Sequence, residues 1–174
     1  MNAAFSGFEH KQRRTGDRKS LEIEKAITES YASVIQLELY PRSEIVIVVH
    51  VLEIDGSSIC AVFNAITLAL IDAGICMTDM LVACSAGFVR DALCRDISHT
   101  EMTGIGACLP VAIKAHTKDI VFAQLENRLS LENLEAALHE AVEGCVQIQE
   151  LLQLGVVGVV KEALARRTES TFSS

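Results

Sequence analysis

The chain has 174 residues, of which 50% are hydrophobic and 22% charged, and its formal net charge is −8. This composition predicts one packed domain and excludes a disordered chain, because disorder requires low hydrophobicity. The negative charge argues against nucleic-acid binding over the whole surface. Asp55, Asp72 and Asp79 interrupt the most apolar region and no apolar signal segment begins the chain, so we expect no membrane partner.

The first elements in chain order are a loop, a helix and a strand. Residues 1–18 carry glycine, serine and charge and are predicted to form a basic loop. A helical period begins at Ser20 and stops before Pro41. Residues 45–54 are dense in β-branched side chains on both faces, which is typical of a covered strand.

A turn, Asp55-Gly56-Ser57-Ser58, joins this strand to an apolar helix over residues 58–73. Ser57 or Ser58 can cap the helix, and Gly74 ends it. The helix is apolar nearly all round, so we expect it to be buried between other elements. A small-residue turn at a helix amino terminus can gather backbone N–H groups around a phosphate.

Four strands and a long helix complete the prediction. The strands cover residues 80–89, 93–97, 109–115 and 120–125, the last two as a hairpin. An amphipathic helix then follows, and glycines weaken its continuation, while the tail over residues 168–174 is predicted to be disordered. The apolar stripe of this helix is Leu131, Leu134, Leu138, Ala141, Cys145, Ile148 and Leu152.

Six cysteines lie within apolar segments, and none belongs to a C-x-x-C pair. Zinc binding and a disulfide framework are therefore disfavoured, and we expect no metal. Buried, reduced, structural thiols are the usual state of such residues, which favours a cytosolic or nuclear protein. The cysteines are Cys60, Cys76, Cys84, Cys94, Cys108 and Cys145.

Five cations stand against one acid over residues 11–19. The segment is interpreted either as a solvated basic arm or as a patch that contacts phosphate groups. The sequence alone leaves both readings open. The cations are Lys11, Arg13, Arg14, Arg18 and Lys19.

Several collinear segments resemble RNase PH-type domains, and most closely the RNase PH-like subunit of the eukaryotic RNA exosome ring that is related to the active archaeal subunit. The segments are GDRKSLEIEKAI, PRSEIVIVVHVLEIDGSS, NAITLALIDAGICMTDM and ACSAGF. The resemblance covers about residues 10–165. It implies an α/β (α+β) fold like that of ribosomal protein S5 domain 2, with a mixed sheet and packed helices over residues 19–167.

Family domains begin with strands that precede the first helix of this chain. The resemblance therefore implies an RNase PH-like domain that is incomplete at its amino terminus, with the family's first strands missing. A sheet without those strands would expose apolar edges and faces. We expect the isolated chain to be marginally stable, to aggregate or to need partners.

The resemblance also implies a function. Six such domains form a ring around a channel through which RNA threads 3′ end first, and active members use inorganic phosphate to release nucleoside diphosphates. Their phosphate site needs a Gly-Thr-Arg turn and a second basic residue. In this chain Ser58 takes the threonine position, Ile59 takes the arginine position, and Lys19 is the candidate second cation, so Gly56, Ser57, Ser58 and Lys19 are remnants of that site.

The carboxylate element of active relatives reads Asp-Leu, three variable residues and Glu-Asp. Here Asp96 and Glu101 are retained, but Met102 replaces the final aspartate. A thioether neither transfers protons nor binds magnesium. Of the other polar residues nearby, His99 is interpreted as a surface loop residue, Asp72 as structural, and Asp55 as a residue that orients the turn.

We therefore expect a non-catalytic structural and RNA-channel subunit of the exosome, supporting 3′-to-5′ RNA processing and degradation. Its expected partners are other RNase PH-like ring subunits, S1/KH cap subunits and RNA, and its expected location is the nucleus, nucleolus and cytoplasm. One alternative is an active phosphate-dependent 3′-to-5′ exoribonuclease, which would need inorganic phosphate and Mg. A third possibility is a small-molecule-binding α/β domain unrelated to RNA.

Overall fold

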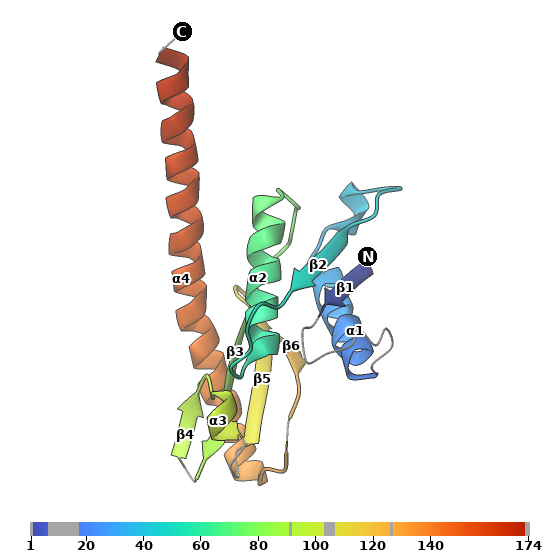
Figure 1. The fold of residues 1–174 in the computed structure, drawn as a ribbon, viewed down its shortest axis with the longest axis vertical. Coiled ribbons are helices and arrows are strands. Elements are labelled where there is room, and N and C mark those ends of the chain that lie inside the picture. Colours follow the sequence, from blue (N-terminus) through green and yellow to red (C-terminus); the bar gives the residue numbers. More distant parts are fainter. Residues whose placement is uncertain (1, 7–17, 91, 103–106, 126, 173–174) are drawn as a thin grey trace.

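A computed structural model describes residues 2–6, 18–90, 92–102, 107–125 and 127–172, and it confirms the predicted α/β class. Strands β3 (Leu81–Val89), β4 (Ala92–Arg95), β5 (Ala107–Lys114) and β6 (Ile120–Ala123) form an antiparallel sheet in the order β4-β3-β5-β6. The predicted hairpin is therefore confirmed as β5 and β6. Helices lie on both faces of this sheet (Figure 1).

One face of the sheet packs against α1 (Arg18–Ala32) and α2 (Ser58–Asp72). Tyr31 and Phe63 stack here with ring centroids 5.8 Å apart. The Tyr31 hydroxyl donates to the Phe63 carbonyl at 2.6 Å and shares a 2.9 Å hydrogen bond with Thr67. Tyr31 and Thr67 are fully buried, so these bonds satisfy polar atoms that would otherwise cost stability.

The other face of the sheet packs against the first half of α4 (Leu131–Phe172). Period-2 alternation along β3 explains the division, since Leu81 and Ala83 belong to the α2 side whereas Val82 and Cys84 belong to the α4 side. Most of the α4 stripe predicted from the sequence packs against the sheet, with Ala141 and Cys145 fully buried. The prediction is wrong for Leu131, which is 72% exposed, and it omitted Ala137, which is fully buried.

The predicted loop over residues 1–18 is wrong for residues 2–6, because β1 (Asn2–Ser6) pairs in parallel with β2 (Val46–His50). These two strands form a separate sheet, so the parallel and antiparallel pairs do not share one mixed sheet. The expectation of a covered strand over residues 45–54 is also wrong. Only one face of β2 is covered, and Val46 and Val48 are more than half exposed, while Leu52 beyond the strand is 96% exposed.

Two helices depart from the sequence predictions. The apolar helix α2 is covered on one side only, since Leu68 is 36% exposed. Helix α4 continues to Phe172, so the prediction of a disordered tail from Thr168 is wrong for the residues described there. Single glycines lower helix stability by only about 1 kcal/mol each, which explains why the helix passes through Gly155 and Gly158. Within the described ranges, no helix has the length and apolarity needed to cross a membrane.

Candidate functional site

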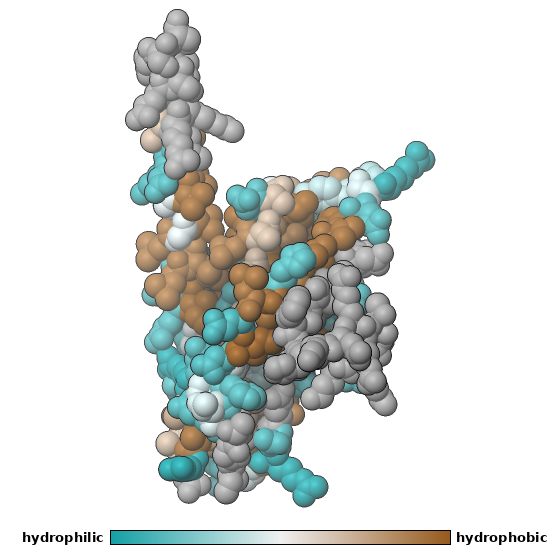
Figure 2. All heavy atoms as spheres, viewed as in Figure 1, coloured by the Kyte–Doolittle hydropathy of each residue, from teal (hydrophilic) through white to brown (hydrophobic). Residues whose placement is uncertain are grey.

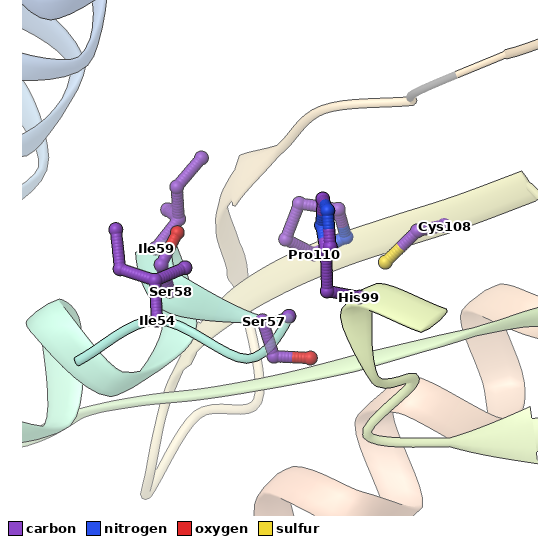
Figure 3. Close-up of a pocket in the computed structure, with 8 residues that line it drawn as sticks. Ile54, Ser57, Ser58, Ile59, His99, Cys108 and Pro110 are labelled. Atoms are coloured by element: carbon purple, nitrogen blue, oxygen red, sulfur yellow. The ribbon is translucent and has the colours of Figure 1, made fainter. Parts of the chain in front are cut away.

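A cavity of about 130 Å³ lies where the turn before α2 meets the short helix α3 (His99–Met102) and β5. On one side of it are residues from the turn and the start of α2: Ile54, Gly56, Ser57, Ser58 and Ile59. Facing them are His99, Cys108 and Pro110 (Figure 3). The predicted phosphate turn therefore does line a cavity, beside the predicted carboxylate element.

The turn has an unusual backbone at its centre. Gly56 has φ 80° and Ser57 has φ 47°, so both occupy the left-handed region that favours glycine. Ser57 is the residue before α2, but its side chain makes no capping hydrogen bond, contrary to the predicted cap. Its hydroxyl instead shares a 2.5 Å hydrogen bond with Ser85 Oγ on β3, which ties the turn to the sheet.

The turn is also tied to the segment that carries the predicted carboxylates. A Cβ atom on Gly56 would lie 2.1 Å from the Ile97 carbonyl oxygen, so the two backbones are in close contact. Asp55 Oδ1 accepts a 3.1 Å hydrogen bond from the His99 N–H. The Asp55 carboxylate thus ties the turn to the start of α3.

Glu101 holds the start of α3 through its side chain. Its Oε2 accepts hydrogen bonds from the Ser98 N–H at 2.9 Å and from Ser98 Oγ at 2.8 Å. These two bonds, the backbone one first, hold the pKa of Glu101 below its ordinary value. A carboxylate held in this way stabilises the turn around α3.

Asp96 is held by its backbone. Its φ is 52°, and its N–H donates to the Ser85 carbonyl at 2.9 Å. Asp96 itself is exposed. Ser85 therefore joins both parts of the site, because its hydroxyl bonds to Ser57 and its carbonyl to Asp96.

Among the described residues that line the cavity, none is lysine or arginine. Ile59, where the resemblance implies arginine in active relatives, lies in the cavity wall and packs against the core formed by α1 and α2. Arg95, which precedes Asp96, is engaged elsewhere: its Nε donates to Glu140 at 2.5 Å and its Nη2 to Glu143 at 3.0 Å, both on α4. The cavity is therefore lined by apolar groups, hydroxyls and one imidazole.

The thiols agree in the main with the prediction of structural cysteines. Cys60, Cys84, Cys108 and Cys145 are buried, and burial raises the pKa of Cys145 to about 12, so the thiol stays protonated at neutral pH. Cys76 is exposed, contrary to the prediction. Among the described residues, no group of three or more His, Cys, Asp or Glu is placed to hold a metal ion.

The other predicted site residues lie apart from this cavity or outside the described ranges. Arg18 and Lys19 are the first residues of α1. Asp72 is exposed at the end of α2. Met102 is the last residue of α3. Lys11, Arg13 and Arg14 lie outside the residues that the structure describes.

Sequence reasoning missed three lining residues. His99 was expected in a surface loop, and Cys108 and Pro110 were assigned no role at the site. His99 is brought to the cavity by the hydrogen bond between its N–H and Asp55, and this contact spans 44 residues. No local pattern in the sequence carries that information.

The sequence matches the 3′ exoribonuclease family, domain 1, over residues 1–76. It is 40% identical to mouse exosome complex component RRP41 over 93% of this chain and 66% of that protein. It is 36% identical to exosome complex component ski6 of Schizosaccharomyces pombe over 94% of this chain and 67% of that protein. The chain thus spans about two thirds of the length of the curated relatives it matches.

The fold is also found among solved structures. The crystal structure of rice Rrp46 superposes with a TM-score of 0.77 at 17% identity, covering 87% of this chain and 70% of that one. This likeness supports the architecture described above, and the sequence relatives carry the assignment. The chain belongs to the RNase PH-like 3′ exoribonuclease family.

Proposed function

We propose that this chain is a non-catalytic ring subunit of an RNA exosome, which helps to guide RNA to 3′-to-5′ processing and degradation without phosphorolysis of its own. The similarity to the mouse and S. pombe exosome components supports the assembly. The chemistry of the cavity supports the absence of catalysis.

The observation that carries the proposal is the isoleucine in the cavity wall. An arginine at position 59 would offer a fork of charged donors to phosphate, whereas Ile59 offers none. A charge-assisted hydrogen bond contributes about 1.5–3 kcal/mol. In the part of the chain that the structure describes, no lysine or arginine lines the cavity to replace it. Inorganic phosphate should therefore bind poorly here.

The carboxylate element supports the same conclusion. The Glu101 carboxylate is engaged by two hydrogen bonds from Ser98 at the start of α3, and Met102 replaces the last carboxylate of the active pattern. Asp96 is then the one acid of that pattern left without a capping role. A single exposed carboxylate beside a cavity without a cation lacks the partner that phosphorolysis needs.

We extend the proposal to the surfaces that the cavity does not explain. The cations Lys11, Arg13, Arg14, Arg18 and Lys19 would contact RNA phosphates without sequence preference. Neighbouring RNase PH-like subunits and S1/KH cap subunits would complete the assembly, in the nucleus, nucleolus and cytoplasm. Alanine substitution of Lys11, Arg13 and Arg14 together should weaken RNA binding and reduce its dependence on salt.

The test is phosphate-dependent RNA degradation by a ring assembled from purified subunits that includes this chain. We expect RNA binding without release of nucleoside diphosphates when inorganic phosphate is added. The matched variant is Asp96→Asn in the same ring, which should behave like the parent.

Robust release of nucleoside diphosphates that Asp96→Asn abolishes would establish the alternative, an active exoribonuclease. Release that Asp96→Asn leaves unchanged would instead come from another subunit of the ring. The variant Ile59→Arg tests directly whether a cation at this position controls phosphate affinity. It should tighten phosphate binding at the cavity by about tenfold or more, as expected for one charge-assisted contact.

A further inference from the structure

The second half of α4 extends beyond the rest of the molecule (Figure 1). Its packing against the sheet ends near Leu152, the last residue of the helix in the core on that face. From Leu151 onward the helix is apolar on several sides and exposed. Leu151 is 67% exposed, Leu154 71%, Val159 63% and Leu164 57%. Figure 2 shows these apolar atoms gathered along α4 and continuing onto the neighbouring α2.

An apolar helix surface of this kind is normally covered by another protein surface. The helix extends into solvent in this structure, so no other part of the described chain covers it. The charged residues at the two ends of the apolar segment indicate which kind of surface covers it. Between residues 150 and 161 the described chain carries charge at Glu150 and Lys161 alone, and both are exposed.

These two residues lie on one face of α4 together with apolar residues. Glu150, Leu154, Val157, Lys161 and Leu164 follow one another at steps of four, three, four and three residues, which is the spacing of a coiled-coil seam. At 3.6 residues per turn, Leu152, which packs on the core, points to the opposite side of the helix. This seam therefore faces away from the body of the molecule.

The seam is complementary to itself in an antiparallel arrangement. When two copies pair about a point between Gly155 and Val156, Leu154 of one copy meets Val157 of the other, and Glu150 of one meets Lys161 of the other. A parallel pair would place Glu150 against Glu150 and Lys161 against Lys161, which is repulsive. The arrangement closes with twofold symmetry, as most homodimers do.

At 3.6 residues per turn, Gly155 and Gly158 lie about 140° and about 80° around the helix from Glu150, so neither is on the seam. A Cβ atom on Gly155 or Gly158 would meet no atom within 4 Å, so nothing in the chain itself occupies the space beside them. Glu162 falls opposite Gln149 in this register and so makes no like-charge contact at that position. We propose that the second half of α4 is an interface between two copies of this chain, paired antiparallel through the seam of Glu150, Leu154, Val157 and Lys161.

The test is a charge swap in the purified full chain, read by analytical ultracentrifugation over a range of concentrations. The parent should pass from monomer to dimer as concentration rises. Glu150→Lys and Lys161→Glu should each weaken dimerisation by about tenfold or more, since each places two like-charge pairs across the twofold axis. The double variant should restore association to within about threefold of the parent.

The controls separate this interface from a general effect of charge or folding. Glu162→Lys makes the same charge reversal off the seam and should leave dimerisation unchanged. Leu154→Asp, an exposed position, should abolish dimerisation while leaving the helical circular dichroism of the monomer intact.

Two outcomes would overturn the inference. One is a parent chain that stays monomeric at every concentration, including the case in which residues of the seam bind a different protein. The other is a double variant that associates no better than the single variants. Neither outcome bears on phosphorolysis, which the cavity decides.

Discussion

The turn at residues 55–58 and the second half of α4 differ in whether their side chains have partners within the chain. In the turn, polar groups are held by partners on β3 and α3, through Ser57 to Ser85 and Asp55 to His99. On α4, large apolar side chains such as Leu154 are left in solvent. One region is complete within the chain, and the other is incomplete without a second molecule.

The comparison shows that the backbone shape of a site and the chemistry of its side chains depend on different groups. The cavity keeps its architecture because backbone contacts and hydroxyl bonds hold the turn, and these do not involve the side chain at position 59. A single substitution can then remove the charge while the turn remains in place. The α4 surface shows the reverse case, in which the backbone is an ordinary helix and the side chains alone define the binding surface.

The largest expected change in the free energy of unfolding comes from alanine substitution of Gly56, and Gly155 is the matched comparison. Gly56→Ala should destabilise the protein by about 3 kcal/mol, because the residue has φ 80° and the added Cβ would lie 2.1 Å from the Ile97 carbonyl oxygen. Gly155→Ala, where nothing lies within 4 Å, should stabilise α4 by roughly 0.5–1 kcal/mol. Urea unfolding of both variants at low protein concentration measures the contrast.

Equal effects of the two alanine substitutions would contradict the comparison. In particular, a Gly56→Ala variant as stable as the parent would mean that the turn and residues 97–98 are not in contact in solution.

A second, smaller effect concerns the hydroxyl pair beneath the cavity. Ser57→Ala should cost about 1.5 kcal/mol, because it leaves the buried Ser85 hydroxyl without the partner 2.5 Å away. Ser58→Ala, one position later, keeps that bond and should change the unfolding free energy by less than about 0.5 kcal/mol. Thermal unfolding of the two variants distinguishes them, and similar losses from both would remove Ser57 from the network that holds the turn.

Much of this fold was predictable from the sequence. The hairpin of β5 and β6 and the packed half of α4 follow from local apolar periodicity, and the start of α2 follows from the turn before it. Periodicity succeeded there because each element buries one face against the same sheet. The apolar lining at Ile59 was also predictable, since it depends on the identity of one residue at a recognisable turn.

The errors have a common physical origin. The exposed faces of α2 and β2 were predicted to be buried, because apolar composition does not reveal whether a covering element belongs to the same chain. β1 was missed because a strand of five residues takes its pairing from β2 and not from its own pattern. His99 reaches the cavity through a contact across 44 residues, which local patterns do not encode.

The smallest expected effect tests whether the retained carboxylate of the site is structural. The folded-state pKa of Glu101 lies below its ordinary value because Ser98 donates two hydrogen bonds to the ionised form. The stabilisation is therefore fully present above the ordinary glutamate pKa, and it is lost as pH falls through the lowered folded-state value. Glu101→Gln should lower the melting temperature slightly at neutral pH, and this difference should vanish under acid conditions, where both side chains are uncharged. Glu53→Gln, which removes the same charge from an exposed segment, is the matched control and should show no such convergence. If Glu101→Gln left the melting temperature unchanged at neutral pH but altered RNA degradation by the assembled ring, the carboxylate would belong to a working site. The proposal that the turn is retained without phosphorolysis would then fail.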